Sequence, residues 1–140
     1  MKGRVLVPGR ASGPLLRLTH PISFWGGVDP RKGEIVDPRH PQFGAAIAGT
    51  VLVVPSAVGS SSSSAIMLEL MREETAPAAI LMGKADAILA LGVVVGRELG
   101  YESLPVLEIA TGRLSGLDEG ANVLVEDGGE VRPDGPGATG

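Results

Sequence analysis

The chain has 140 residues, 44% of them hydrophobic and 20% charged, which is long enough and apolar enough for one domain with its own core. Its formal net charge is −4 and no basic stripe is present, so the composition argues against a nucleic-acid partner. The chain contains no cysteine, which excludes a disulfide framework and any thiolate ligand for zinc or an iron–sulfur cluster.

The N-terminal sequence bears on two questions, the location of the protein and its first secondary structure. We expect a cytoplasmic protein whose first two strands pair with each other. Residues 1–13 lack the apolar core and cleavage site of a signal peptide, and no apolar run approaches the length of a membrane span, so no membrane partner is expected. A short β-type run at residues 3–7 ends at Pro8-Gly9, and residues 14–18 form the expected return strand. The first element is therefore predicted to be a β-hairpin.

Residues 20–41 form a Pro- and Gly-rich stretch without helical or strand periodicity. The stretch is longer than most connections inside a compact domain, so it is either disordered or functional. The pair Phe24-Trp25 argues against disorder and suits either a core plug or an interface anchor. The following Gly26-Gly27 predicts a backbone turn with positive φ or the close approach of another group.

The same stretch holds both histidines of the chain. His20, His40, Asp29 and Asp37 are conceivable metal ligands, but their spacing matches no closed metal site. Each aspartate precedes a proline, which is typical of an Asx turn in which the carboxylate accepts from a backbone N–H two residues on. The structural interpretation is therefore favoured over a metal site.

The central stretch, residues 51–70, reads as strand, loop and helix. An apolar run at 51–54 leads through a Gly-Ser loop at 59–64 into a segment with helical spacing of apolar residues. Ser64, or a serine just before it, is a natural N-cap. A helix N-terminus favours a carboxylate, a phosphate or a developing alkoxide. A capped helix behind a plain serine linker stays open as the alternative.

The second half of the chain alternates strands and helices. We predict a strand at 78–82, a helix at 87–99 that begins at Asp86 and packs closely at Gly92 and Gly96, and a strand at 105–109. This alternation indicates parallel crossover units and an α/β fold. A hairpin at 122–132 follows, so we expect a single domain over residues 1–132 and a disordered Gly/Pro tail over residues 133–140.

Several segments, in this order and spacing, resemble one known family: PISFWGGVDP, DPRHP, AGTVLVVPSAVGSSSSS, TAPAAILM and DAILALGVVV. From about residue 3 to about residue 109 the chain looks like the small subunit of aconitase X, the swivelling-domain part of a dehydratase branch of the aconitase superfamily. The resemblance implies a swivelling β/β/α domain with a mixed sheet and flanking helices. It also implies a heterodimer with a large subunit that holds an iron or iron–sulfur centre, none being bound by this chain.

The resemblance further implies hydro-lyase chemistry on a small hydroxy acid. Ser60, the first residue after the loop glycine, would accept the proton, while Gly59, Ser61 and Ser62 would bind a substrate oxygen. Related swivelling domains place an arginine shortly after their serines, whereas here the nearest is Arg72, so carboxylate binding is expected to fall to the large subunit. The isolated chain should be inactive.

Two substrates fit the resemblance. The stretch at 75–100 looks more like the bacterial pattern, which favours cis-3-hydroxy-L-proline, and mevalonate 5-phosphate is the alternative. A phosphotransfer swivelling domain needs a histidine on a Gly-rich loop, but His20 and His40 abut prolines and neither follows such a loop. A non-catalytic anion-binding module that has kept the fold is the third possibility.

Overall fold

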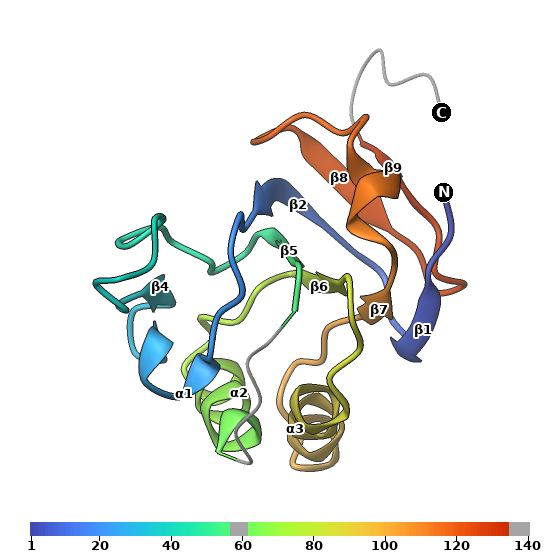
Figure 1. Ribbon diagram of the computed structural model, residues 1–140. Helices are drawn as coiled ribbons and strands as arrows, with labels where there is room; N and C mark the ends of the chain where they lie inside the picture. The colour runs from blue at the N-terminus through green and yellow to red at the C-terminus, as the bar shows by residue number, and fades with distance from the viewer. Residues whose placement is uncertain (57–61, 135–140) are drawn as a thin grey trace.

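The computed structural model describes residues 1–56 and 62–134, and it contains one large sheet, a small ribbon and short helices (Figure 1). The strands of the large sheet are β1 (Arg4–Val7), β2 (Ala11–Arg17), β5 (Val51–Val54), β6 (Ala79–Met82), β7 (Val106–Glu108), β8 (Asn122–Val125) and β9 (Val131–Pro133). Their order is β1-β7-β6-β5-β2-β8-β9, and the ribbon pairs β3 (Val28–Asp29) with β4 (Glu34–Ile35). The helices are α1 (Phe24–Gly27), α2 (Ser63–Arg72), α3 (Ala87–Glu98) and the 3-10 turn η1 (Thr111–Leu114).

The centre of the sheet is parallel, as the alternating pattern predicts. β5 pairs with β6 and β6 with β7 in parallel, and α2 and α3 are the crossover helices between them. The register places Val54 beside Met82 and Met82 beside Glu108. The three strands therefore finish at the same edge of the sheet, which we call the carboxyl edge.

Apolar side chains cover both faces of the parallel strands. On one face Leu52, Ile80 and Val106 belong to a core cluster with side chains of α2 and α3. On the other face Val53 and Leu81 belong to a second cluster with side chains of η1 and of the β8–β9 hairpin. Continuous apolar runs are typical of strands buried on both faces, and the result is the predicted β/β/α arrangement.

The predicted N-terminal hairpin is wrong. β1 pairs antiparallel with β7, whereas β2 pairs parallel with β5 and antiparallel with β8. The turn signal Pro8-Gly9 ends β1 correctly, but a turn does not decide which strand becomes the partner. Strand pairing follows burial, and β2 buries Leu15 in the second cluster only when it lies between β5 and β8.

The two outer strands of the sheet approach each other. Gly3 N–H donates to Gly129 O at 2.9 Å, and Val131 N–H donates to Met1 O at 2.8 Å. Figure 1 shows the N-terminus and β1 beside the β8–β9 hairpin. The sheet is thus curled so that the β1 edge is partly covered, which limits unpaired backbone at that edge.

The two main helices begin near the predicted positions. Asp86 caps α3 as predicted, because its Oδ1 accepts from Ile88 N–H at 2.9 Å and from Leu89 N–H at 3.2 Å. α2 ends at Arg72, before the predicted stop at Pro77, because Glu74 adopts a positive φ of 59° that breaks the helix.

The C-terminal hairpin forms as predicted and extends slightly farther. β9 includes Pro133, and Asp134 N–H donates to Asn122 O at 2.9 Å. Residues 133 and 134 are therefore part of the folded domain, and the rest of the predicted tail, residues 135–140, lies outside the described residues. In the described part of the chain no helix is long and apolar enough to cross a membrane.

Candidate functional site at the carboxyl edge of the sheet

Two loops meet at the carboxyl edge. Gly83, just after β6, donates its N–H to Val54 O at 2.9 Å. A Cβ at Gly83 would lie 2.7 Å from Pro55 O, so glycine permits this close approach to the start of the β5–α2 connection. In open α/β sheets, ligands bind in the crevice outside the carboxyl ends of the strands, which makes this edge the candidate site.

One residue of the predicted serine site, Ser62, lies at this edge. Ser62 directly precedes α2, and its carbonyl accepts from Ala65 N–H at 3.1 Å and from Ile66 N–H at 3.3 Å. The helix therefore begins within the serine run, as predicted. The other predicted site residues, Gly59, Ser60 and Ser61, lie outside the described residues.

Two buried polar atoms mark the same edge. Ser63 Oγ and Asp86 Oδ2 are the buried side-chain atoms without a hydrogen-bond partner in the part of the chain that the structure describes. Ser63 is the first residue of α2 and is 0% exposed, while Asp86 precedes α3. Unpaired buried polar atoms are rare in folded proteins and call for an explanation. Their position at two helix starts on one edge favours a polar ligand there.

The loop between β6 and α3 is braced by a residue that the sequence analysis missed. Glu108, the last residue of β7, accepts from Arg4 Nε at 2.9 Å through Oε1 and from Ala85 N–H at 2.8 Å through Oε2. The Arg4 hydrogen bond is the main cause that lowers the pKa of Glu108, and the Ala85 N–H adds to it. A charged residue that ends an apolar strand is the only sequence signal for this role.

Arg72 does not reach the carboxyl edge. It follows Ser63 by nine residues, a rise of about 14 Å along α2. Its guanidinium pairs with Glu69 at 2.8 Å and with Glu73 at 3.4 Å. The hydrogen bond that Arg72 donates to the Glu69 carboxylate is the main cause that raises the pKa of Arg72. This confirms its predicted place on the polar face of the helix.

The aspartates of the 20–41 stretch form the predicted Asx turns. Asp29 Oδ1 accepts from Arg31 N–H, and Asp37 Oδ1 accepts from Arg39 N–H, both at 2.9 Å. The latter hydrogen bond is the main cause that lowers the pKa of Asp37. The stretch is folded, with a short helix and the β3–β4 ribbon.

The His40 ring is engaged by the backbone, whereas His20 Nδ1 lies 2.9 Å from the Thr19 hydroxyl. His40 Nδ1 accepts from Gln42 N–H at 3.0 Å, which leaves Nε2 as the donor to His20 O at 3.2 Å. Their rings lie 6.2 Å apart. Across residues 1–56 and 62–134, no group of three potential His, Asp or Glu ligands lies together, and the chain has no cysteine. The donors present therefore do not fit an iron or iron–sulfur centre.

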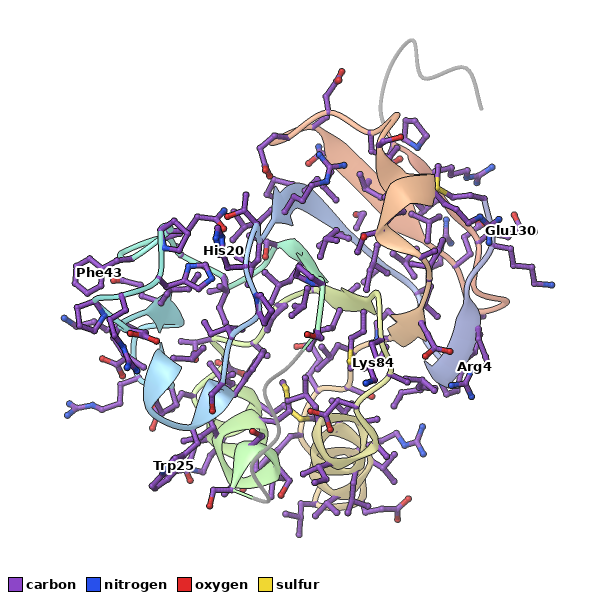
Figure 2. The ribbon with its side chains drawn as sticks, viewed as in Figure 1. Arg4, His20, Trp25, Phe43, Lys84 and Glu130 are labelled. Carbon is purple, nitrogen blue, oxygen red and sulfur yellow. The ribbon has the colours of Figure 1, made fainter. Side chains whose placement is uncertain are left out.

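The aromatic pair divides between the two predicted roles. Phe24 is 0% exposed and belongs to the helix-side core, whereas Trp25 is 57% exposed. Figure 2 shows Trp25 at the outer surface beside α2. Gly26 adopts the predicted positive φ, at 79°. Phe24 is therefore the core plug, and Trp25 is free to contact another chain.

The fold and the site together define a class. A mixed sheet with parallel crossovers, helices on one face and a curled β layer on the other is a swivel-type α/β domain, here with a serine-rich helix start at its carboxyl edge. A sequence model of the aconitase X swivel domain matches residues 1–132. The chain belongs to the aconitase X swivel-domain family.

The relatives fall into two groups by length. Cis-3-hydroxy-L-proline dehydratase of Pseudomonas aeruginosa is 48% identical over 103 residues, which are 74% of this chain and 18% of that protein. The phosphomevalonate dehydratase small subunit of Methanothermobacter thermautotrophicus is 37% identical over 131 residues, 92% of this chain and 95% of that protein. The chain thus spans about a fifth of the first relative and nearly the whole of the second.

A solved structure confirms the fold. A crystal structure of Thermococcus kodakaraensis aconitase X in its holo form superimposes with a TM-score of 0.83 at 35% identity. The match covers 96% of this chain and 97% of the other. The expected swivelling β/β/α fold is therefore confirmed.

Proposed function

We propose that this chain is the small subunit of a two-subunit aconitase X-type dehydratase that eliminates water from a small hydroxy acid. The observation that carries the proposal is the serine-rich start of α2 at the carboxyl edge, within a domain of this family. The unpaired Ser63 Oγ and Asp86 Oδ2 support a polar ligand at the same place. A hydro-lyase needs such polar groups to hold a substrate oxygen.

The assembly with a large subunit is supported by the relatives. A separate small subunit with which this chain aligns over 92% of its length is a direct precedent. The 57% exposed Trp25 offers an apolar anchor for a second chain. The donors of this chain do not fit an iron centre, so we place that centre on the large subunit.

We propose Ser60 as the proton acceptor. It follows Gly59 in the connection from β5 to α2, and both ends of that connection lie at the carboxyl edge. A proton would pass from a substrate carbon to Ser60 Oγ, while the hydroxyl on the adjacent carbon leaves and a double bond forms. A serine hydroxyl is a weak base near neutral pH, so the positive end of α2 must favour the alkoxide. Gly59, Ser61 and Ser62 would hold a substrate oxygen.

Two substrates have specific support. The 48% identity to a cis-3-hydroxy-L-proline dehydratase favours the hydroxy amino acid. The nearly full-length alignment with a phosphomevalonate dehydratase small subunit favours mevalonate 5-phosphate as the alternative. A non-catalytic anion-binding module is the remaining possibility. In that case the chain would dehydrate neither substrate, whether it is free or in a stable complex with a large subunit.

The test is an assay of the assembled complex. The chain is co-expressed with its candidate large subunit, loaded anaerobically with iron, and given each substrate separately, with product followed by mass spectrometry. We expect loss of one water from one substrate, and no turnover by either chain alone. A folded, iron-loaded complex that dehydrates neither substrate would overturn the proposal in favour of the binding module.

A further inference from the structure

Lys84 is an exposed cation at the carboxyl edge. It follows Gly83 in the turn between β6 and α3, and its side chain is exposed. No ion pair within residues 1–56 and 62–134 includes it. Figure 2 shows Lys84 between the end of β6 and α3, with Arg4 farther out on β1.

The backbone on both sides of Lys84 is fixed by hydrogen bonds. The preceding residue, Gly83, donates its N–H to Val54 O at 2.9 Å. The following residue, Ala85, donates its N–H to Glu108 Oε2 at 2.8 Å. The turn is therefore held against β5 on one side and β7 on the other. This arrangement presents Lys84 beside the start of the β5–α2 connection.

Neither carboxylate next to the Lys84 turn forms an ion pair with Lys84 in the part of the chain that the structure describes. Glu108 is engaged by Arg4 and by the Ala85 N–H. Asp86 uses Oδ1 to cap α3, and its buried Oδ2 has no hydrogen-bond partner among the described residues. The ammonium group of Lys84 is thus left for an external anion, and charge-assisted hydrogen bonds to such an anion are about twice as strong as neutral ones. The N-terminus of α2, which is the positive end of the helix dipole, also favours a negatively charged group.

We propose that Lys84 binds an oxyanion group of the substrate, a carboxylate or a phosphate, and that Glu108 is the positioning residue that holds the Lys84 turn. This inference rests on the proposed dehydratase function and adds a substrate-binding residue of this chain. It departs from the expectation that carboxylate binding falls to the large subunit.

The first experiment compares three variants of the assembled, iron-loaded complex. Lys84→Met removes the charge, Lys84→Arg keeps it, and Lys32→Met removes a lysine near the opposite edge, where Gly33 lies close to Thr75 O. We expect Lys84→Met to raise KM by about 10-fold or more, with Lys84→Arg and Lys32→Met within about 3-fold of wild type. An unchanged KM in Lys84→Met would overturn the inference while leaving the dehydratase intact.

Competitive inhibitors identify the oxyanion. Acetate and inorganic phosphate are each titrated against the wild-type complex and against Lys84→Met. Weakened inhibition by acetate would assign Lys84 to a carboxylate, and weakened inhibition by phosphate would assign it to a phosphate. Equal inhibition of both enzymes by both anions would contradict the inference. If the wild-type complex turns over neither substrate, the proposed function fails and the inference fails with it.

The role of Glu108 is tested by a double-mutant cycle. Glu108→Ala removes the acceptor for Ala85 N–H and should raise KM in the same direction as Lys84→Met. Because Glu108 acts through Lys84, the double variant should show little more than the effect of Lys84→Met alone. If the fold-increase of KM in the double variant equals the product of the fold-increases in the two single variants, Glu108 acts independently of Lys84. That result would overturn its positioning role.

Discussion

Glu74 holds a left-handed backbone conformation with φ of 59°, the single non-glycine example among residues 1–56 and 62–134. Its N–H donates to Met71 O at 3.2 Å, and Thr75 N–H donates to Leu70 O at 2.9 Å. A left-handed residue with such hydrogen bonds back to the last helical turn is a common helix ending. Glycine usually occupies this position, because a Cβ is unfavourable in the left-handed conformation.

Glu74→Gly should therefore stabilise the domain. Relief of the left-handed strain outweighs the added chain entropy, and we expect a gain of about 0.5–1 kcal/mol in the free energy of unfolding, measured by urea denaturation. Glu73→Gly is the matched control, because Glu73 has φ of −80° and gains nothing from glycine. Equal effects of the two changes would show that Glu74 stores no strain.

Glu108 should make stability depend on pH. Its pKa in the folded chain is lowered, first by the Arg4 hydrogen bond, so its contribution is present above the unfolded-state pKa and is lost as pH falls through the lower folded-state pKa. Wild type should exceed Glu108→Gln in urea stability at about pH 7, and the gap should narrow by about pH 3. A gap that stays constant across this range would rule out the ionised carboxylate as its source.

The residue-scale features that the sequence predicts are local ones. Asp29, Asp37 and Asp86 each accept from an N–H two residues along the chain, so the neighbouring residues are sufficient to predict the turn or cap. The brace from Glu108 to Ala85 spans 23 residues, and its link to Arg4 spans 104. Such contacts depend on strand order and are not visible in the sequence pattern.

Helices α2 and α3 pack closely where α3 carries glycines. A Cβ at Gly92 would lie 2.9 Å from Ser64 O and 3.0 Å from the Met67 Cβ. A Cβ at Gly96 would meet the flexible end of Met71, with Sδ at 2.6 Å. Glycine is a weak helix former, so its presence here reflects packing, as the sequence predicts.

The two glycines should differ in their tolerance of alanine. At Gly92 the obstacle is the backbone of α2, so Gly92→Ala should lower the free energy of unfolding by about 1–2 kcal/mol despite better helix propensity. Gly96→Ala should cost less, because the Met71 side chain can move aside. Thermal and urea unfolding of the two variants provide the comparison, and the opposite order would refute this account of the contact.

At the element scale, type was more predictable than pairing. The apolar runs of β5, β6 and β7 and the helical spacing of α2 and α3 identify those elements, because burial on two faces or one face leaves a regular pattern. The partner of β1 was not predictable, because Pro8-Gly9 marks only where the strand ends. The end of α2 at Arg72 was missed because a glutamate at position 74 gives no signal of a left-handed residue.

At the scale of the whole molecule, the curled sheet depends on the contact of residues 1–3 with residues 129–131. Gly129 has φ of 90°, and a Cβ there would lie 2.6 Å from Gly3 O. Gly129→Ala should therefore cost about 2 kcal/mol or more in urea unfolding. Gly128→Ala meets no atom within 4 Å and should stay within about 0.5 kcal/mol of wild type. Similar losses of unfolding free energy in Gly129→Ala and Gly128→Ala would mean that the contact between residues 1–3 and 129–131 contributes nothing to stability.

The fold class and the position of the candidate site at the start of α2 follow from the sequence, whereas the residues that make up the candidate site follow from it only in part. The order of strand, serine loop and helix places Ser62, just before α2, at the carboxyl edge. Lys84 comes to the same edge only because β6 lies beside β5 in the sheet, which is a property of the whole fold.

The most direct test of the dehydratase account is the turnover of the assembled complex with Ser60→Ala. Ser103→Ala, which lies before β7 at the opposite edge, is the matched control. If Ser60 accepts the proton, kcat should fall by about 100-fold or more in Ser60→Ala, with assembly and iron content unchanged, and should stay at the wild-type value in Ser103→Ala. Retained turnover in Ser60→Ala would remove this serine as the base and contradict the account.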